Sequence, residues 1–87
     1  MTVVGCFLSS EEHGPGFLVR TAQQAEEAGF PAVLISDHYH PWTNAQGESP
    51  FVWSVIGAIA ASTRLRVTTG VTCPTVRINP AIIAQAA

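Results

Sequence analysis

One short segment of this 87-residue chain concentrates side chains that could carry out proton chemistry. The segment SDHYHPW, residues 36–42, follows an apolar run and contains Asp37, His38, His40 and Trp42. An imidazole beside a carboxylate in a partly apolar pocket can take a proton from a hydroxyl. An indole N–H can donate a hydrogen bond to a developing oxyanion. We therefore interpret His38 as a candidate general base, with Asp37 beside it and Trp42 as a candidate oxyanion donor.

The same segment allows a second interpretation, as a metal site. His38 and His40 stand two residues apart next to Asp37, and imidazole and carboxylate ligands suit zinc or iron. Residues i and i+2 share a face only where a strand continues through them, and Pro41 indicates that the chain is already turning. No third ligand is evident in the sequence. A metal-dependent hydrolase using His38 and His40 stays open as the alternative from another class, and we assign no metal ligands.

Each candidate also has a purely structural interpretation. An aspartate after a strand is often a turn former, and Trp42 could simply anchor a long loop. A histidine at a strand end, such as His38, can serve only to bond the backbone. The spacing of these residues does not decide between the structural and the chemical interpretations.

Composition excludes several other classes of protein. A net charge of −2 with four Lys and Arg residues offers no basic face for nucleic acid. Neither GxGxxG nor GxxxxGK[ST] occurs, and the acidic segment at 9–16 argues against a dinucleotide pyrophosphate there. The longest uncharged stretch, 49–63, is shorter than the ~20 residues of a membrane span. With two cysteines and no CxxC, we expect a cytoplasmic protein with reduced thiols.

The segments that must position these residues alternate between strand and helix patterns. Apolar runs predict strands at 3–8, 32–35 and 65–71, the last broken by Pro74. Leu18, Ala22 and Ala25 recur at helical spacing, which predicts an amphipathic helix of about 13 residues from Pro15 to a stop at Gly29. Ser49 and Pro50 suggest the N-cap and first residue of a second helix at 51–61, apolar nearly all round and therefore deeply covered. Asn79 and Pro80 open a third helix.

Three strand–helix repeats of roughly 30 residues each are typical of βα units with a parallel sheet. We expect residues 1–87 to be the amino-terminal part of one larger α/β domain, either a (β/α)8 barrel or a doubly wound sheet. Functional groups gather at the carboxyl ends of parallel strands in both folds. That places Asp37 and His38 at the mouth of a pocket, together with residues 9–13 after the first strand. Because the third helix stops in mid-pattern, we expect the 87 residues alone to be inactive.

The whole chain resembles the bacterial luciferase-like superfamily, and in particular its branch of coenzyme F420-dependent glucose-6-phosphate dehydrogenases. The resemblance is carried by AEEAGFPAVLISDHYHPW (25–42), SPFVW (49–53), TRLRVTTGV (63–71) and CPTVRINPAIIAQA (73–86). It implies a (β/α)8 barrel, here represented by its first three βα units. It also implies a deazaflavin, F420, bound at the carboxyl-end mouth, and hydride transfer between that ring and a small organic substrate.

The resemblance implies roles for individual residues. His38 would act as the base on a substrate hydroxyl, Trp42 would stabilise the charged intermediate, and Asp37 would contact substrate and cofactor in the same pocket. Cys73, where the sugar-phosphate dehydrogenases have threonine, would contact the cofactor. The Gly70–Val71 peptide would be cis, in a bulge behind the deazaflavin ring.

Two features of the resemblance leave the reaction open. FMN-dependent monooxygenases share the barrel, so an FMN enzyme is the alternative within the superfamily. His40 stands where a non-basic residue is commoner, which leaves open a substrate other than a sugar phosphate, such as an alcohol. We expect a small-molecule substrate, no nucleic-acid or membrane partner, and a homodimeric parent enzyme.

Overall fold

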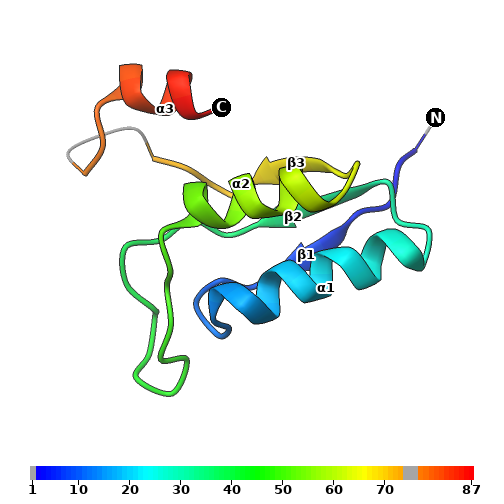
Figure 1. The fold of residues 1–87 in the computed structure, drawn as a ribbon. Helices are drawn as coiled ribbons and strands as arrows, with labels where there is room; N and C mark the ends of the chain where they lie inside the picture. The colour runs from blue at the N-terminus through cyan, green and yellow to red at the C-terminus, as the bar shows by residue number, and fades with distance from the viewer. Residues whose placement is uncertain (1, 74–76) are drawn as a thin grey trace.

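The computed structural model describes residues 2–73 and 77–87, along which three strands and three helices alternate in the predicted order (Figure 1). They are β1 (Cys6–Leu8), α1 (Pro15–Glu27), β2 (Ala32–Ile35), α2 (Val52–Ser62), β3 (Arg66–Thr69) and α3 (Pro80–Ala86). Within this part of the chain, no helix has the length and hydrophobicity needed to cross a lipid bilayer.

The strands form one parallel sheet in the order β1-β2-β3, with α1 and α2 on one of its faces and α3 set apart from it (Figure 1). Leu8 pairs with Ile35, and Ile35 pairs with Thr69, so the carboxyl ends of the three strands lie along one edge. Side chains alternate across the sheet. Leu8 and Ile35 are buried beneath the helices, whereas Phe7 and Leu34 on the other face are 55% and 37% exposed. In the described chain, the sheet is therefore covered on one face only.

The core lies between the sheet and the pair of helices α1 and α2. α1 begins at Pro15, whose fixed φ suits the first turn of a helix, and it buries Leu18, Ala22 and Ala25 as predicted. α2 contributes Val52, Val55 and Ile59 to the same apolar cluster as Leu8, Val33 and Ile35. Gly29, at φ +99°, ends α1 at the predicted place.

The start of α2 differs from the prediction. The helix begins at Val52 and not at Phe51, and no side chain caps its first turn. The hydroxyl of Ser49 instead donates to the carbonyl of His38, at 2.7 Å, so the predicted Ser49 N-cap is wrong. The expected deep burial is also wrong for the described chain, because α2 buries one stripe, Val52, Val55 and Ile59, and leaves Ala58, Ala60 and Ala61 exposed.

The strands are shorter than their apolar runs. Val3 and Val4 are exposed and precede β1, and β3 ends at Thr69 before the predicted limit of Val71. The peptide bond Gly70–Val71 is cis, as the resemblance implied. The expected break at Pro74 lies outside the described residues. Asn79 caps α3 as predicted, because its side chain accepts a hydrogen bond from the N–H of Ala81 at 2.9 Å.

Two exposed glycines provide a test of the turn that ends α1. Gly29 has φ +99°, whereas Gly57 lies within α2, and a Cβ at either position would meet no atom within 4 Å. Gly29→Ala should lower the free energy of unfolding by about 1 kcal/mol, since an L-residue is disfavoured in left-handed backbone. Gly57→Ala should raise it by about 0.5–1 kcal/mol, through helix propensity. Urea denaturation of the protein at its natural length measures both, and changes of the same sign would contradict this account of the turn.

Candidate active site

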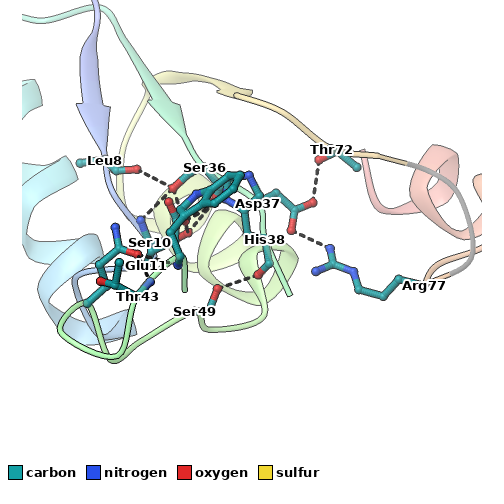
Figure 2. A network of polar contacts seen from close by, with 12 residues as sticks. Leu8, Ser10, Glu11, Ser36, Asp37, His38, Thr43, Ser49, Thr72 and Arg77 are labelled. Carbon is teal, nitrogen blue, oxygen red and sulfur yellow. Dashed lines mark hydrogen bonds and ion pairs between the residues drawn. The ribbon is translucent and has the colours of Figure 1, made fainter. Parts of the chain in front are cut away.

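The carboxyl ends of β1 and β2 bring four polar side chains into the interior. Ser10 and Glu11 follow β1, Ser36 and Asp37 follow β2, and all four are buried. Buried polar groups are costly unless they are paired. The structure therefore has to supply partners at this edge, and Figure 2 shows the network that does so.

Ser10 and Ser36 form the centre of the network. The N–H of Ser10 donates to Oγ of Ser36 at 2.9 Å, and Oγ of Ser10 lies 2.6 Å from the carbonyl oxygen of Ser36 and 2.8 Å from Oε2 of Glu11. A hydroxyl has only one proton to donate, so Ser10 donates to one of these two oxygens at a time. Together the two serines join the end of β1 to the end of β2.

Glu11 contacts the ring of His38, and we call these residues the Glu11–His38 pair. Nδ1 of His38 lies 3.3 Å from Oε2 of Glu11, which is an ion-pair distance, although the N–H direction does not satisfy hydrogen-bond geometry. The Glu11 side chain is nearly inaccessible, while about a third of the His38 side chain is exposed. The imidazole thus has one nitrogen beside a buried carboxylate.

The surroundings of Glu11 favour its charged form. Burial alone would raise the pKa of the Glu11 carboxyl, but contacts from Ser36, Ser10 and His38 outweigh burial and hold that pKa below its ordinary value. A carboxylate that stays ionised can stabilise a positive charge on the neighbouring imidazole. The pair therefore has the electrostatics of a general base with its supporting anion.

Asp37 points the other way, into a contact that we call the Asp37 clamp. Its Oδ1 accepts from Nη2 of Arg77 and its Oδ2 accepts from Oγ1 of Thr72, both at 2.7 Å (Figure 2). The clamp ties the end of β2 to residue 72, beyond β3, and to the segment just before α3. Both carboxylate oxygens are thus already engaged, and direct binding of substrate or cofactor by Asp37 stays a prediction.

Trp42 packs against the His38 ring in a T-shaped arrangement. The two ring centroids are 5.3 Å apart at an interplanar angle of 73°, and the tryptophan is 74% exposed. The carboxamide oxygen of Gln46 accepts from the backbone N–H of Trp42 and fixes the turn that carries it. The indole is therefore adjacent to the candidate base, and its role as an oxyanion donor stays a prediction.

Two cavities adjoin His38. One, of about 180 Å³, is lined by Asp37, His38, Tyr39, Cys73 and Arg77. The other, of about 310 Å³, is lined by His38, Tyr39 and Arg77 together with Ser49, Pro50, Phe51 and Ile78. The predicted cofactor residue Cys73 is thus brought to the same cavity as His38.

Gly70 and Val71 lie at the end of β3, two to three residues before Cys73. A Cβ at Gly70 would come within 3.1 Å of the Leu34 side chain, so the backbone packs closely there, while Val71 is exposed. Their contact with a cofactor stays a prediction.

The metal interpretation gains no support from the geometry. His40 is exposed and its ring packs edge-on against Tyr39, with centroids 4.4 Å apart. In the described ranges 2–73 and 77–87, no group of three or more His, Cys, Asp or Glu side chains could hold a metal ion. The described residues therefore do not bring His38 and His40 together with a third ligand, as a metal-dependent hydrolase would need.

Sequence reasoning missed the partner of His38. The residue pattern places Glu11 near the pocket only as one of five polar residues after the first strand, and it gives no role to Ser10 or Ser36. Parallel pairing of β1 with β2 was the available signal, because it brings the residues after both strands together. Which of the five would turn inward depends on the loop conformation, which the residue pattern does not define.

Residues 1–87 match the family model described as luciferase-like monooxygenase, so the chain belongs to that family. It is 44% identical over 87 residues to an F420-dependent glucose-6-phosphate dehydrogenase of Intrasporangium calvum, covering 99% of this chain and 26% of that protein. It is 45% identical over 84 residues to an F420-dependent hydroxymycolic acid dehydrogenase of Mycobacterium tuberculosis, covering 95% and 23%.

A solved structure has the same fold. An F420-dependent secondary alcohol dehydrogenase, determined with an F420-acetone adduct, superimposes with a TM-score of 0.90 at 38% identity, covering 98% of this chain and 26% of that one. The fold is accordingly that of βα units of a (β/α)8 barrel, and the predicted fold class is confirmed. The chain spans about a quarter of the length of the relatives that it matches.

The Asp37 clamp generates a stability prediction. Arg77→Met leaves a buried carboxylate with Thr72 as its remaining partner. Losing one partner of a fully buried pair costs about 3–5 kcal/mol, and we expect about 2 kcal/mol here because solvent screens the partly exposed guanidinium. Adding Asp37→Asn should restore part of the loss. Arg64→Met, at an exposed arginine, is the control and should change the free energy of unfolding by less than about 0.5 kcal/mol. A double variant no more stable than Arg77→Met would contradict the clamp.

The lowered pKa of Glu11 predicts how stability depends on pH. A carboxyl whose pKa falls on folding contributes stability above its unfolded pKa of about 4.3, and the contribution disappears as pH falls through the lower folded value. The difference in unfolding free energy between wild type and Glu11→Gln should therefore be greatest above that pH and shrink in more acidic solution. Denaturant titrations from pH 7 to pH 3 measure it. A difference that is constant with pH would show that ionised Glu11 is not favoured by folding.

Proposed function

We propose that this chain carries the general base of an F420-dependent oxidoreductase, which transfers a hydride between the deazaflavin and a small alcohol-like or sugar-phosphate substrate. The observation that carries the proposal is the Glu11–His38 pair, an imidazole held against a buried carboxylate beside two cavities. The F420-dependent relatives support the choice of cofactor. A cytoplasmic location, as part of one barrel domain, fits the two free cysteines.

The residues at this edge fit part of a flat heterocycle. An apolar cavity of about 150 Å³ can hold benzene, and the cavity beside Cys73, of about 180 Å³, is of that order. Val71 adds an exposed apolar surface at the end of β3, and Gly70 keeps side-chain atoms away from that turn. We propose that Gly70, Val71 and Cys73 would hold F420, and that Asp37 would act on the same site through the clamp. When bound, F420 supplies an acceptor for the hydride that leaves the substrate carbon.

In this mechanism His38 accepts the hydroxyl proton of the substrate. Nδ1 lies beside Glu11, so we assign the proton of the neutral ring to Nδ1, which leaves Nε2 free to accept. The O–H bond breaks toward Nε2 while the C–H bond breaks with its electron pair, and the alcohol becomes a carbonyl compound. Glu11 stabilises the imidazolium that forms, and Trp42 would assist by donating its indole N–H to the developing alkoxide.

The uncovered sheet face supports a further part of the proposal. Phe7 and Leu34 are exposed on the side opposite to the helices, which in a closed barrel would be interior. We therefore expect residues 1–87 on their own to lack activity. Activity has to be measured on the protein at its natural length.

The two histidines of the motif give a matched test. His38→Ala should lower kcat for F420 reduction by a secondary alcohol about 10²–10⁴-fold, the usual contribution of a general base. His40→Ala should change kcat by less than about threefold, because its exposed ring contacts Tyr39 and lines neither cavity beside His38. Absorbance of oxidised F420 measures the rate.

The competing cofactor is tested with the same protein. Tight binding of FMN with no binding of F420 would reverse the assignment in favour of a monooxygenase. Equal losses of kcat in the two histidine variants would remove His38 from its proposed role.

A further inference from the structure

Two consecutive residues, Glu48 and Ser49, contact the main chain of both members of the Glu11–His38 pair. The N–H of Glu48 donates to the carbonyl of Glu11 at 3.0 Å. The hydroxyl of Ser49 donates to the carbonyl of His38 at 2.7 Å, and Figure 2 shows this contact at the lower edge of the site. The loops after β1 and β2 are therefore joined to each other through one short piece of chain.

Ser49 has an unusual backbone conformation. Its φ is +132°, and among the described residues the others with positive φ are Gly29 and Gly47. This region strongly favours glycine, so another residue persists there only where the surroundings hold it. Pro50 restricts the conformation of the preceding residue further. A serine at this position is therefore expected to make a side-chain contact that glycine could not make.

The hydroxyl of Ser49 makes such a contact, with the carbonyl of His38. Within residues 2–73 and 77–87, the hydrogen bond that Ser49 makes with its side chain is the one to His38, and no side chain caps α2. The bond closes the long connection between β2 and α2 just after the strand. Without it, no hydrogen bond among the described residues would join the main chain of His38 to the segment before α2.

We propose that Ser49 is a positioning residue, which holds the backbone of His38 so that its ring stays against Glu11. The inference rests on the proposed function, because it assumes that the placement of His38 matters for turnover. A displacement of a catalytic group by about 1 Å can cost about 10²-fold in rate, so a main-chain contact suffices to affect kcat. Ser49 also lines the larger cavity beside His38, and its hydroxyl is already directed to the carbonyl.

Two substitutions separate positioning from stability. Ser49→Ala removes the hydroxyl and keeps the strained φ, whereas Ser49→Gly removes the hydroxyl and relieves it. Both variants should lose kcat by about tenfold, with KM for the alcohol and Kd for F420 within about twofold of wild type. Ser49→Gly should nevertheless melt at a higher temperature than Ser49→Ala. Equal losses of kcat in two variants of different stability would show that the rate depends on the hydroxyl and not on the stability of the protein. Ser62→Ala, which removes a hydroxyl bonded to Ala58 within α2, is the control and should leave kcat unchanged.

A second measurement does not depend on turnover. The pKa of the Glu11 carboxyl lies below its ordinary value although burial raises it, and the contact with His38 is one of the causes. Carbon-detected NMR of the carboxyl carbon as a function of pH would measure this pKa in each variant. In both Ser49 variants this pKa should rise toward the ordinary value, and in Ser62→Ala it should not move.

The outcomes separate the two proposals. Wild-type protein that never reduces F420 would overturn the proposed function, and the Glu11 titration would then decide the positioning role by itself. Active wild type, together with Ser49 variants of unchanged kcat and unchanged Glu11 pKa, would overturn the positioning role and leave the proposed function intact.

Discussion

The site depends on the parallel pairing of β1 with β2. The ladder continues to the last residues of the strands, since the N–H of Ser36 donates to the carbonyl of Leu8 at 3.2 Å. Because parallel strands end at the same edge, the chain after β1 and the chain after β2 leave the sheet side by side. Glu11 and His38, far apart in sequence, meet for that reason. The apolar contacts of α1 and α2 with one face of the sheet hold the two strands in this register.

Burial at this edge then determines which polar groups are compatible with the fold. Ser10 and Ser36 are inaccessible to solvent. The Ser36 hydroxyl accepts from the N–H of Ser10, and the Ser10 hydroxyl lies against the Glu11 carboxylate, so the two hydroxyls replace the water that these buried groups cannot reach. An unpaired buried donor or acceptor costs about 1–3 kcal/mol. Replacing either serine by alanine would therefore destabilise the protein by more than the small loss of side-chain volume suggests. The serines therefore belong to the fold and to the electrostatics of Glu11 at the same time.

The sequence predicts the periodic features well and the loop contacts poorly. Leu18, Ala22 and Ala25 repeat along a helix, and Asn79 precedes a proline, so local rules suffice for α1 and for the start of α3. Ser49 satisfies the same local rule for an N-cap, yet its hydroxyl bonds the carbonyl of His38 from another loop. That carbonyl is available only after β2 and the following loop have taken their places. Contacts of this kind depend on tertiary arrangement, and the contact of Glu11 with His38 was missed for the same reason.

The two buried carboxylates of the site differ in what their partners can do. Asp37 faces a guanidinium, which keeps its proton under all physiological conditions, so the charges of this pair stay constant. Glu11 faces an imidazole, a group that can be neutral or protonated, so the charge of the second pair is not fixed by the kind of residue. Neighbouring residues Asp37 and His38 thus belong to two different pairs, one of constant charge and one whose charge depends on the imidazole. Under the proposed function, the bonds of Asp37 to Thr72 and Arg77 would hold the chain beside His38 in place while the charge of the imidazole changes.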